Sequence, residues 1–210
     1  MTRVGVVCGY DLNGDLAAYV AGVARELARV HCDVVIFSGG QTSPVTWHSE
    51  AWTIADGVHA LLPELEIMLE ERAMTTLDNL LFAHAIAERS YPGVALDYAV
   101  FCDSAHARKV GILSRMILGK RAMVVALPRE VALRVRLFEP VSILFEMLGV
   151  HSPRMRRFVR RGAVLLKGLT AEQRRSVLRA AASAVGLPHR RRRTSGKASR
   201  PASHPLAPRQ

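Results

Sequence analysis

Short apolar runs of strand length alternate along this chain with longer segments whose apolar residues recur at helical spacing. Runs such as Val34–Phe37 and Ala122–Leu127 contain no polar residue, which is typical of parallel strands buried on both faces of a sheet. The segment that begins at Asp15 carries apolar side chains three or four residues apart, as an amphipathic helix does. The alternation predicts an α/β protein with a Rossmann-like open parallel sheet and helices on both faces.

The boundaries of the expected elements follow from where each pattern begins and stops. We expect strands at Val4–Cys8, Val34–Phe37, Leu65–Leu69, Tyr98–Cys102 and Ala122–Leu127. The helices between them are expected to start near Asp15, Trp47, Thr75 or Thr76, and Asp103 or Ser104. Residues 1–127 therefore form the predicted Rossmann-like core.

Two further segments follow the core. Residues 128–187 have only helical spacing, and we expect a helical extension that packs on the core, built from Arg129–Leu148, with Pro140 as an interruption, and Thr170–Val185. Residues 188–210 hold seven basic residues and no acid. Such a composition cannot bury a core, so we expect a disordered basic tail.

The charge of the chain is unevenly distributed. Residues 1–150 hold 13 Lys and Arg against 17 Asp and Glu, whereas residues 151–210 hold 16 basic residues against the single acid Glu172. A basic carboxyl-terminal part of this kind suggests contact with nucleic acid or with an anionic membrane. A solvated tail that only aids solubility explains the composition equally well.

Several classes of protein are disfavoured by the sequence. No apolar run approaches the length of a membrane-spanning helix, and Met1–Gly5 enters a strand without the layout of a secretory signal. The three cysteines have no paired spacing, which suits buried thiols in a reducing cytoplasm. Nothing has the spacing of metal ligands, so no metal site is expected.

Polar clusters follow three of the expected strands and define a candidate site. They comprise Ser38, Gly39 and Gly40, then Thr76 and Asn79, then Asp103, Ser104, His106 and Arg108. In an open parallel sheet the carboxyl ends of the strands share one edge with the amino ends of the following helices, and ligands bind there. We therefore expect these residues to meet in one crevice, rich in backbone N–H groups and suited to an anion.

Each cluster also has a structural explanation. The glycines form a tight turn, Thr76 and Asn79 satisfy the first turn of a helix, and Glu50 is a favourable acid at a helix start. A lone histidine is most often structural, but the position of His106 after a strand favours function. In that role His106 is an acid or base, and Arg108 holds a phosphate or carboxylate.

Together these stretches resemble one family, the bacterial domain family of largely unassigned function that includes SanA, ElyC and YdcF. The similar pieces cover about residues 4–127 and are Ser38-Gly39-Gly40, Glu50, Glu70 or Glu71 with Thr76-Leu77-Asp78-Asn79, and Ser104-Ala105-His106-Ala107-Arg108. The resemblance implies a Rossmann-like domain with these residues lining one pocket. It also implies links to envelope or lipid-carrier physiology in some members and S-adenosylmethionine binding in one.

This chain departs from that family in two ways. The turn after its first strand, Cys8-Gly9-Tyr10-Asp11, is less rich in glycine, and it has no amino-terminal membrane segment. The resulting expectation is a cytoplasmic protein that binds a small anionic or nucleotide-like ligand, such as S-adenosylmethionine or a phosphorylated envelope precursor. The residues leave open whether the site is catalytic; hydrolysis of a phosphorylated small molecule is the reaction class they suggest first.

Two alternatives rest on the basic carboxyl-terminal region. In one, the chain associates with nucleic acid without sequence preference, because no recognised reading motif accompanies the charge. In the other, it is an interaction protein at the inner surface of the membrane, held by Arg129–Leu148 and by the tail.

Overall fold

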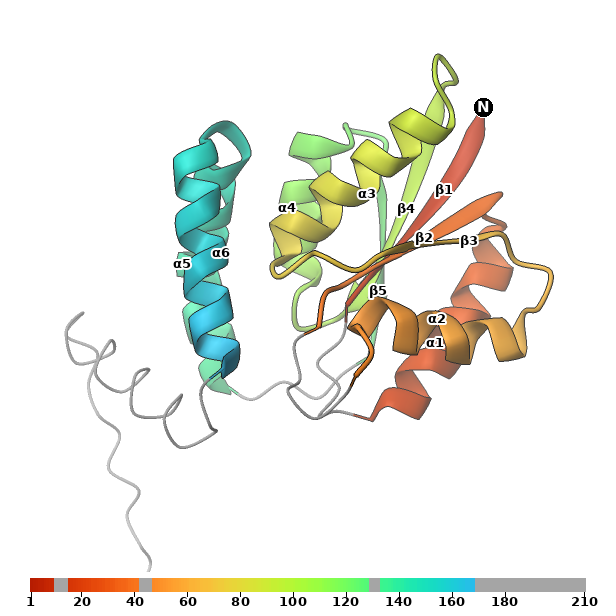
Figure 1. The fold of residues 1–210 in the computed structure, drawn as a ribbon, viewed down its shortest axis with the longest axis horizontal. Coiled ribbons are helices and arrows are strands. Elements are labelled where there is room, and N and C mark those ends of the chain that lie inside the picture. Colours follow the sequence, from red (N-terminus) through yellow and green to blue (C-terminus); the bar gives the residue numbers. More distant parts are fainter. Residues whose placement is uncertain (10–14, 42–46, 129–132, 169–210) are drawn as a thin grey trace, which may run out of the picture. The chain divides into compact units, whose positions relative to one another are not determined.

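The computed structural model describes residues 1–9, 15–41, 47–128 and 133–168. A five-stranded sheet lies at its centre, with every strand pair parallel and the strands in the order β3-β2-β1-β4-β5 (Figure 1). The strands are β1 (Thr2–Cys8), β2 (Val34–Ser38), β3 (Ile67–Glu70), β4 (Leu96–Asp103) and β5 (Met123–Leu127). The predicted α/β class and open parallel sheet are confirmed.

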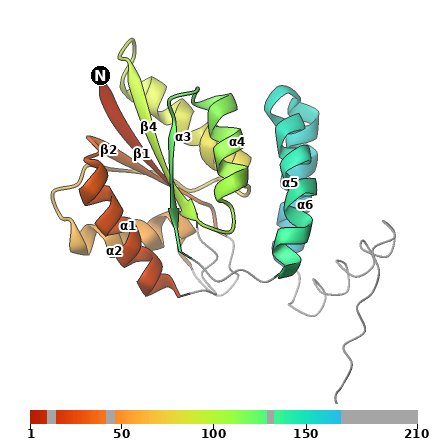
Figure 2. The same ribbon diagram turned by 180° about the vertical axis from the view of Figure 1, so that it is seen from behind.

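Helices cover both faces of the sheet, as the alternating pattern predicts. The helices are α1 (Leu16–Val30), α2 (Glu50–Leu61), α3 (Thr76–Ser90), α4 (Ala107–Ile117), α5 (Leu133–His151) and α6 (Pro153–Gly168). Helices α1 and α2 pack on one face, and α3 and α4 pack on the other (Figures 1 and 2). The layers follow from the chain order, because each right-handed crossover returns the chain to a parallel neighbour.

The strands bury side chains on both faces, which explains their unbroken apolar sequences. Val35 and Phe37 of β2 join the core under α1 and α2, whereas Val34 and Ile36 join the core under α3 and α4. All four are fully buried. Burying a side chain of this size contributes about 1.5–3 kcal/mol. A shift of β2 by one residue would move each side chain to the opposite core, so packing in the two cores specifies the register of this strand.

Two helix starts differ from the sequence-based expectation. Helix α2 begins at Glu50 with Ser49 as its cap, three residues after the expected start. Helix α4 begins at Ala107, because Asp103 still belongs to β4. The Asp103 side chain and carbonyl both accept from the His106 N–H, at 3.1 Å each. Asp103 therefore closes a turn before the helix and is not the cap of α4.

Helices α5 and α6 form an antiparallel pair beyond the sheet. Helix α5 continues through Pro140, so the expected interruption at this residue is wrong. The pair packs on α3 and α4. The Leu77 N–H of α3 donates to the Glu146 carboxylate of α5 at 2.8 Å. No described helix is long and apolar enough to cross a membrane. The predicted helix Thr170–Val185 and the predicted tail 188–210 lie outside the described residues.

Candidate functional site

The residues predicted for the site lie at one edge of the sheet, where its strands end. Parallel register aligns Cys8 with Ser38 and Ser38 with Glu70 at the last positions of β1, β2 and β3. On the other side, Asp103 ends β4 opposite Leu127 of β5. Gly39, Thr76, Asn79, Ser104 and His106 each follow one of these ends within a few residues or one loop. We call this side of the molecule the carboxyl edge.

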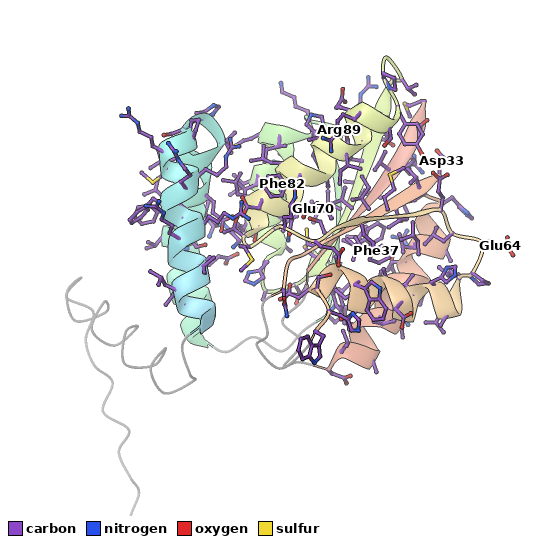
Figure 3. The ribbon with its side chains drawn as sticks, in the orientation of Figure 1. Asp33, Phe37, Glu64, Glu70, Phe82 and Arg89 are labelled. Atoms are coloured by element: carbon purple, nitrogen blue, oxygen red, sulfur yellow. The ribbon has the colours of Figure 1, made fainter. Side chains whose placement is uncertain are left out.

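Ser38 and Glu70 hold the loop between β3 and α3. The Ser38 hydroxyl donates to Glu70 Oε2 at 2.9 Å, and both side chains are buried. The Glu70 carboxylate also accepts from the backbone N–H groups of Arg72, at 2.9 Å, and Ala73, at 3.1 Å. Figure 3 shows Glu70 at the end of β3, beside the start of α3. Glu70, rather than Glu71, is therefore the acid that joins the strand ends, whereas Glu71 accepts from Ser49.

Gly39 and Gly40 serve close packing more than anion binding. The Gly39 N–H donates to Glu70 O at 2.9 Å, and the Gly40 N–H donates to Ala73 O at 2.6 Å. These donors therefore face the β3–α3 loop, contrary to the expectation that they approach an anion. A Cβ on Gly39 would lie 2.9 Å from the Cα of Gly9 and 3.1 Å from the Cβ of Glu50. The glycines let β1, β2 and the buried Glu50 meet.

Thr75, and not Thr76, is the cap of α3. Its hydroxyl accepts from the Asp78 N–H at 3.0 Å, and Thr76 is the first residue of the helix. Asn79 turns its side chain inward, with Oδ1 3.3 Å from the Ser38 hydroxyl, and a hydrogen bond joins it to the Cys8 thiol. Asn79 therefore links β1, β2 and α3 at the centre of the carboxyl edge.

The start of α4 presents a different environment. Side chains of Asp15, Ser49 and Thr75 cap α1, α2 and α3, whereas the His106 side chain makes no capping hydrogen bond to α4. Ser104 and Arg108 are exposed at this helix start, and His106 is half-buried. A helix amino end carries partial positive charge, and its first N–H groups have no acceptor within the helix, which favours an anion.

Sequence reasoning missed an ion pair beneath this helix start. Lys109 of α4 donates to Glu146 of α5 at 3.0 Å, and both side chains are buried. Ser142 contacts both partners, at 3.4 Å from the Lys109 amine and 3.3 Å from the Glu146 carboxylate. The available signal was an acid inside the apolar stretch of α5, but only the packing of α5 on α4 identifies its partner.

Asp78 was also missed, because its position in a capping pattern gave it a simpler explanation. Its side chain is buried and accepts from the Met74 N–H at 3.2 Å, with the Arg160 guanidinium of α6 3.8 Å away. Burial raises the pKa of the Asp78 carboxyl above its ordinary value of 3.8, against the opposing effects of the Met74 hydrogen bond and Arg160. Asp78 joins the amino end of α3 to α6.

The thiols near the carboxyl edge are poor nucleophiles. Burial, with the nearby Asp103 carboxylate, raises the pKa of the Cys8 thiol to about 12. Burial also raises the pKa of the Cys102 thiol. Thiolates, not thiols, attack electrophiles and bind metals. In the described residues, no group of three His, Cys, Asp or Glu side chains is placed to hold a metal ion.

Aromatic side chains stand at the rim of the carboxyl edge. Trp47 is 94% exposed and Trp52 is 37% exposed. The His48 ring stacks on the Trp52 indole with 3.9 Å between ring centroids. Both residues flank Ser49 and Glu50, whose positions over β1 and β2 fix the start of α2. Exposed planar rings therefore stand in the first turn of α2 and just before it.

A hollow lies at the opposite edge of the sheet, away from the predicted site. It has a volume of about 310 Å³ and lies between the carboxyl ends of α1 and α2, with Leu27, Cys32, Leu62 and Leu65 in its lining. Its lining is mainly apolar and brings no cluster of polar groups together, so it does not resemble the predicted ligand crevice.

Comparisons with known proteins add no relative. No family model, no curated protein and no solved structure matches this chain.

Proposed function

We propose that the chain binds a small anionic, nucleotide-like ligand at the carboxyl edge of its sheet. The observation that carries this proposal is the start of α4, a helix amino end that its cap residue His106 does not cap with a side chain and where Ser104 and Arg108 are exposed. It follows β4, which pairs with β1 where the strand order reverses. Ligands of open α/β sheets bind at such a reversal, and helix amino ends favour phosphate or carboxylate groups.

The buried charges of the edge support this choice of position. Glu50, Glu70, Asp78 and Asp103 are buried at the edge, and the buried cation Lys109 already has Glu146 as its partner. An anion would therefore be repelled from the interior of the edge. The outer side of α4, where the Arg108 guanidinium is exposed, is the position that suits it.

The aromatic rim supports a ligand with a planar base. Trp52 lies in the first turn of α2, and Trp47 precedes this helix, which starts beyond the end of β2. Helix α4 starts beyond the end of β4, with β1 between the two strands. In this arrangement the base of the ligand stacks on indole while its phosphate lies at α4. The family resemblance adds S-adenosylmethionine and phosphorylated envelope precursors to the ligands of interest.

A catalytic role would use the same helix start. His106 would exchange a proton with the substrate or with water, and Arg108 would hold the anion, as in hydrolysis of a phosphorylated small molecule. The buried Cys8 and Cys102 thiols do not supply a nucleophile at neutral pH. We place this activity in the cytoplasm, in keeping with the three unpaired cysteines.

Intrinsic fluorescence provides a direct test, because the two tryptophans of the chain both stand at this rim. Titration with nucleotides, S-adenosylmethionine or polyprenyl phosphates should change the emission of the parent protein. Arg108→Ala should weaken the response about tenfold or more, because a charge-assisted contact to the anion is lost.

Arg115→Ala is the matched control, since Arg115 is an exposed arginine in the last turn of the same helix. It should leave the titration unchanged. The proposal is wrong if none of these ligands changes the emission, or if Arg108→Ala and Arg115→Ala respond to the ligand as the parent does.

The alternative function, in nucleic-acid or membrane-surface association, draws on a different part of the chain. Most of the basic residues in the carboxyl-terminal region 151–210 lie in 169–210, outside the described residues. The described part of this region is α6, which carries five arginines between positions 154 and 161 and no acid. These arginines stand beside exposed apolar residues of α5 and α6, and the two features together distinguish between nucleic acid and a membrane surface as the partner.

A further inference from the structure

The pair of helices α5 and α6 exposes an apolar face that the described structure leaves uncovered. Its members are Val141, Leu144, Phe145, Leu148, Phe158 and Leu165, and we call them the hairpin face. Leu144 is 57% exposed, Phe158 is 64% exposed and Leu165 is 70% exposed. So many large exposed apolar side chains on one pair of helices mark an interaction surface rather than the ordinary surface of a globular protein.

Spacing and contact show that these residues form one continuous surface. On α5 the residues 141, 144, 145 and 148 recur three and four positions apart, so they lie on one side of the helix. On α6 the residues 158 and 165 are seven positions apart and also share a side. The rings of Phe145 and Phe158 lie 6.2 Å apart between centroids, so the two stripes meet at this pair.

The arginines of α6 divide into two groups. Arg156 donates to the carbonyl groups of Gly149 and Val150, and Arg160 donates to the carbonyl of Arg72 and lies near Asp78. These two hold the helices in place. Three others, Arg154, Arg157 and Arg161, are exposed. Arg154 and Arg161 lie four positions before and three positions after Phe158, and Arg157 directly precedes it, so positive charge borders the apolar face along one side of α6.

We propose that the hairpin face attaches the protein to an anionic lipid bilayer. A surface helix with apolar residues on one side and arginines beside them lies in the interface of such a bilayer, with its apolar side among the acyl chains and its cations at the head groups. The acid of α5 that lies closest to the face, Glu146, is buried with Lys109 and does not oppose this attraction.

Charge distinguishes the bilayer from the other occupants that could cover this face. A second copy of the chain would bring Arg154, Arg157 and Arg161 against the same residues of its partner, and like charges in contact oppose association. The carboxyl-terminal segment 171–210 carries ten Lys and Arg against the single acid Glu172, so it has the same sign as the face. Nucleic acid matches the charge, but its phosphate backbone leaves the exposed Leu and Phe side chains without an apolar partner.

Insertion of the face can be measured with one reporter. In the full chain carrying Trp47→Phe and Trp52→Phe, the substitution Phe158→Trp places the sole indole on the hairpin face. Vesicles of phosphatidylcholine with about 30% phosphatidylglycerol should shift its emission to shorter wavelengths, and brominated lipids should quench it, whereas pure phosphatidylcholine vesicles should not. Emission that stays unchanged while the protein co-sediments with the anionic vesicles would overturn the proposal, because the basic tail alone would then account for adsorption.

Co-sedimentation of otherwise unaltered full-length variants provides the second measurement. Leu144→Asp should lower partition into the anionic vesicles about tenfold or more, because burial of one leucine changes an equilibrium by at least that factor. Leu61→Asp is the matched control, since Leu61 is 55% exposed on α2, and it should partition as the parent does. Thermal melting of both variants checks that the fold is retained.

Three results would overturn the assignment. The first is equal partition of Leu144→Asp and the parent. The second is a dimer in solution that Leu144→Asp dissociates, together with no binding to vesicles, which would identify a second copy as the occupant. The third is tight binding to nucleic acid with no partition into anionic vesicles. Neither vesicle measurement depends on ligand binding at the carboxyl edge, so the two proposals can fail separately.

Discussion

Gly39 illustrates how neighbours restrict a single residue at the carboxyl edge. Its N–H donates to Glu70 O, and a Cβ at this position would approach the Cα of Gly9 to 2.9 Å. A backbone atom cannot move aside as the end of a flexible side chain can. The Glu50 side chain closes the same space from above, with its Cβ at 3.1 Å. A pattern of glycines after a strand thus reflects packing between two strand ends and a buried acid.

We predict that Gly39→Ala lowers the free energy of unfolding by about 1–3 kcal/mol, the usual cost of overpacking a well-filled site. Chemical denaturation of the parent and the variant measures it. Gly111→Ala is the control, because Gly111 lies inside α4 and a Cβ there meets no atom within 4 Å. It should raise stability by about 0.5–1 kcal/mol through helix propensity. A stable Gly39→Ala variant would show that the strand ends tolerate displacement.

At the scale of helices and strands, the sequence pattern did not specify how α5 packs on α3 and α4. Glu146 accepts from the Leu77 N–H of α3 at 2.8 Å and from Lys109 of α4 at 3.0 Å. One carboxylate thus satisfies a helix amino end and a buried cation at the same time. Helices α3 and α4 are therefore both held at their first turns by α5.

We predict that Lys109→Met destabilises the protein by about 3–5 kcal/mol, because it leaves the Glu146 carboxylate buried without its cation. Adding Glu146→Gln should recover part of this loss, since the neutral amide oxygen can still accept from Leu77. The exposed Lys120 provides the control: Lys120→Met should change stability by less than about 0.5 kcal/mol. Equal losses in the single and double variants would mean that the pair contributes no coupling.

At the scale of the whole molecule, the buried Asp78 makes global stability depend on pH. Burial raises the pKa of this carboxyl in the folded state above 3.8. Between 3.8 and the folded-state pKa, the folded protein therefore binds more protons than the unfolded chain. Asp78 therefore does not reduce the free energy of unfolding below pH 3.8, and it reduces this free energy increasingly as the pH rises through the folded-state pKa.

We predict that Asp78→Asn removes this loss, so the variant gains stability relative to the parent as the pH rises from about 4 to neutrality. Urea denaturation at a series of pH values measures the difference. Asp56→Asn neutralises an exposed acid of α2 and should show no such trend. If the difference between Asp78→Asn and the parent stays constant with pH, the ionisation of Asp78 is not linked to folding.

The parts of the fold that local patterns encode were predictable from the sequence. Unbroken apolar runs such as Val34–Phe37 indicated strands buried on both sides, and the spacing after Asp15 indicated α1. The parallel sheet followed from their alternation, and so did the placement of Gly39 and His106 at one edge. These inferences succeed because burial and handedness act on short segments and on their order.

Contacts between distant segments were decided only by tertiary structure. Nothing near Ser38 in sequence indicates that it bonds to Glu70, and nothing near Lys109 indicates Glu146. The N–H groups of Gly39 and Gly40 likewise donate to carbonyl groups at the end of β3 and in the β3–α3 loop, which are distant from them in sequence. Such pairings depend on which polar groups are left unsatisfied after the layers have packed, and each buried group takes the partner that the fold brings near. The sequence by itself determined the strands, the helices that alternate with them and the edge at which the strands end. Tertiary packing determined which polar residues support that edge and which remain exposed at it.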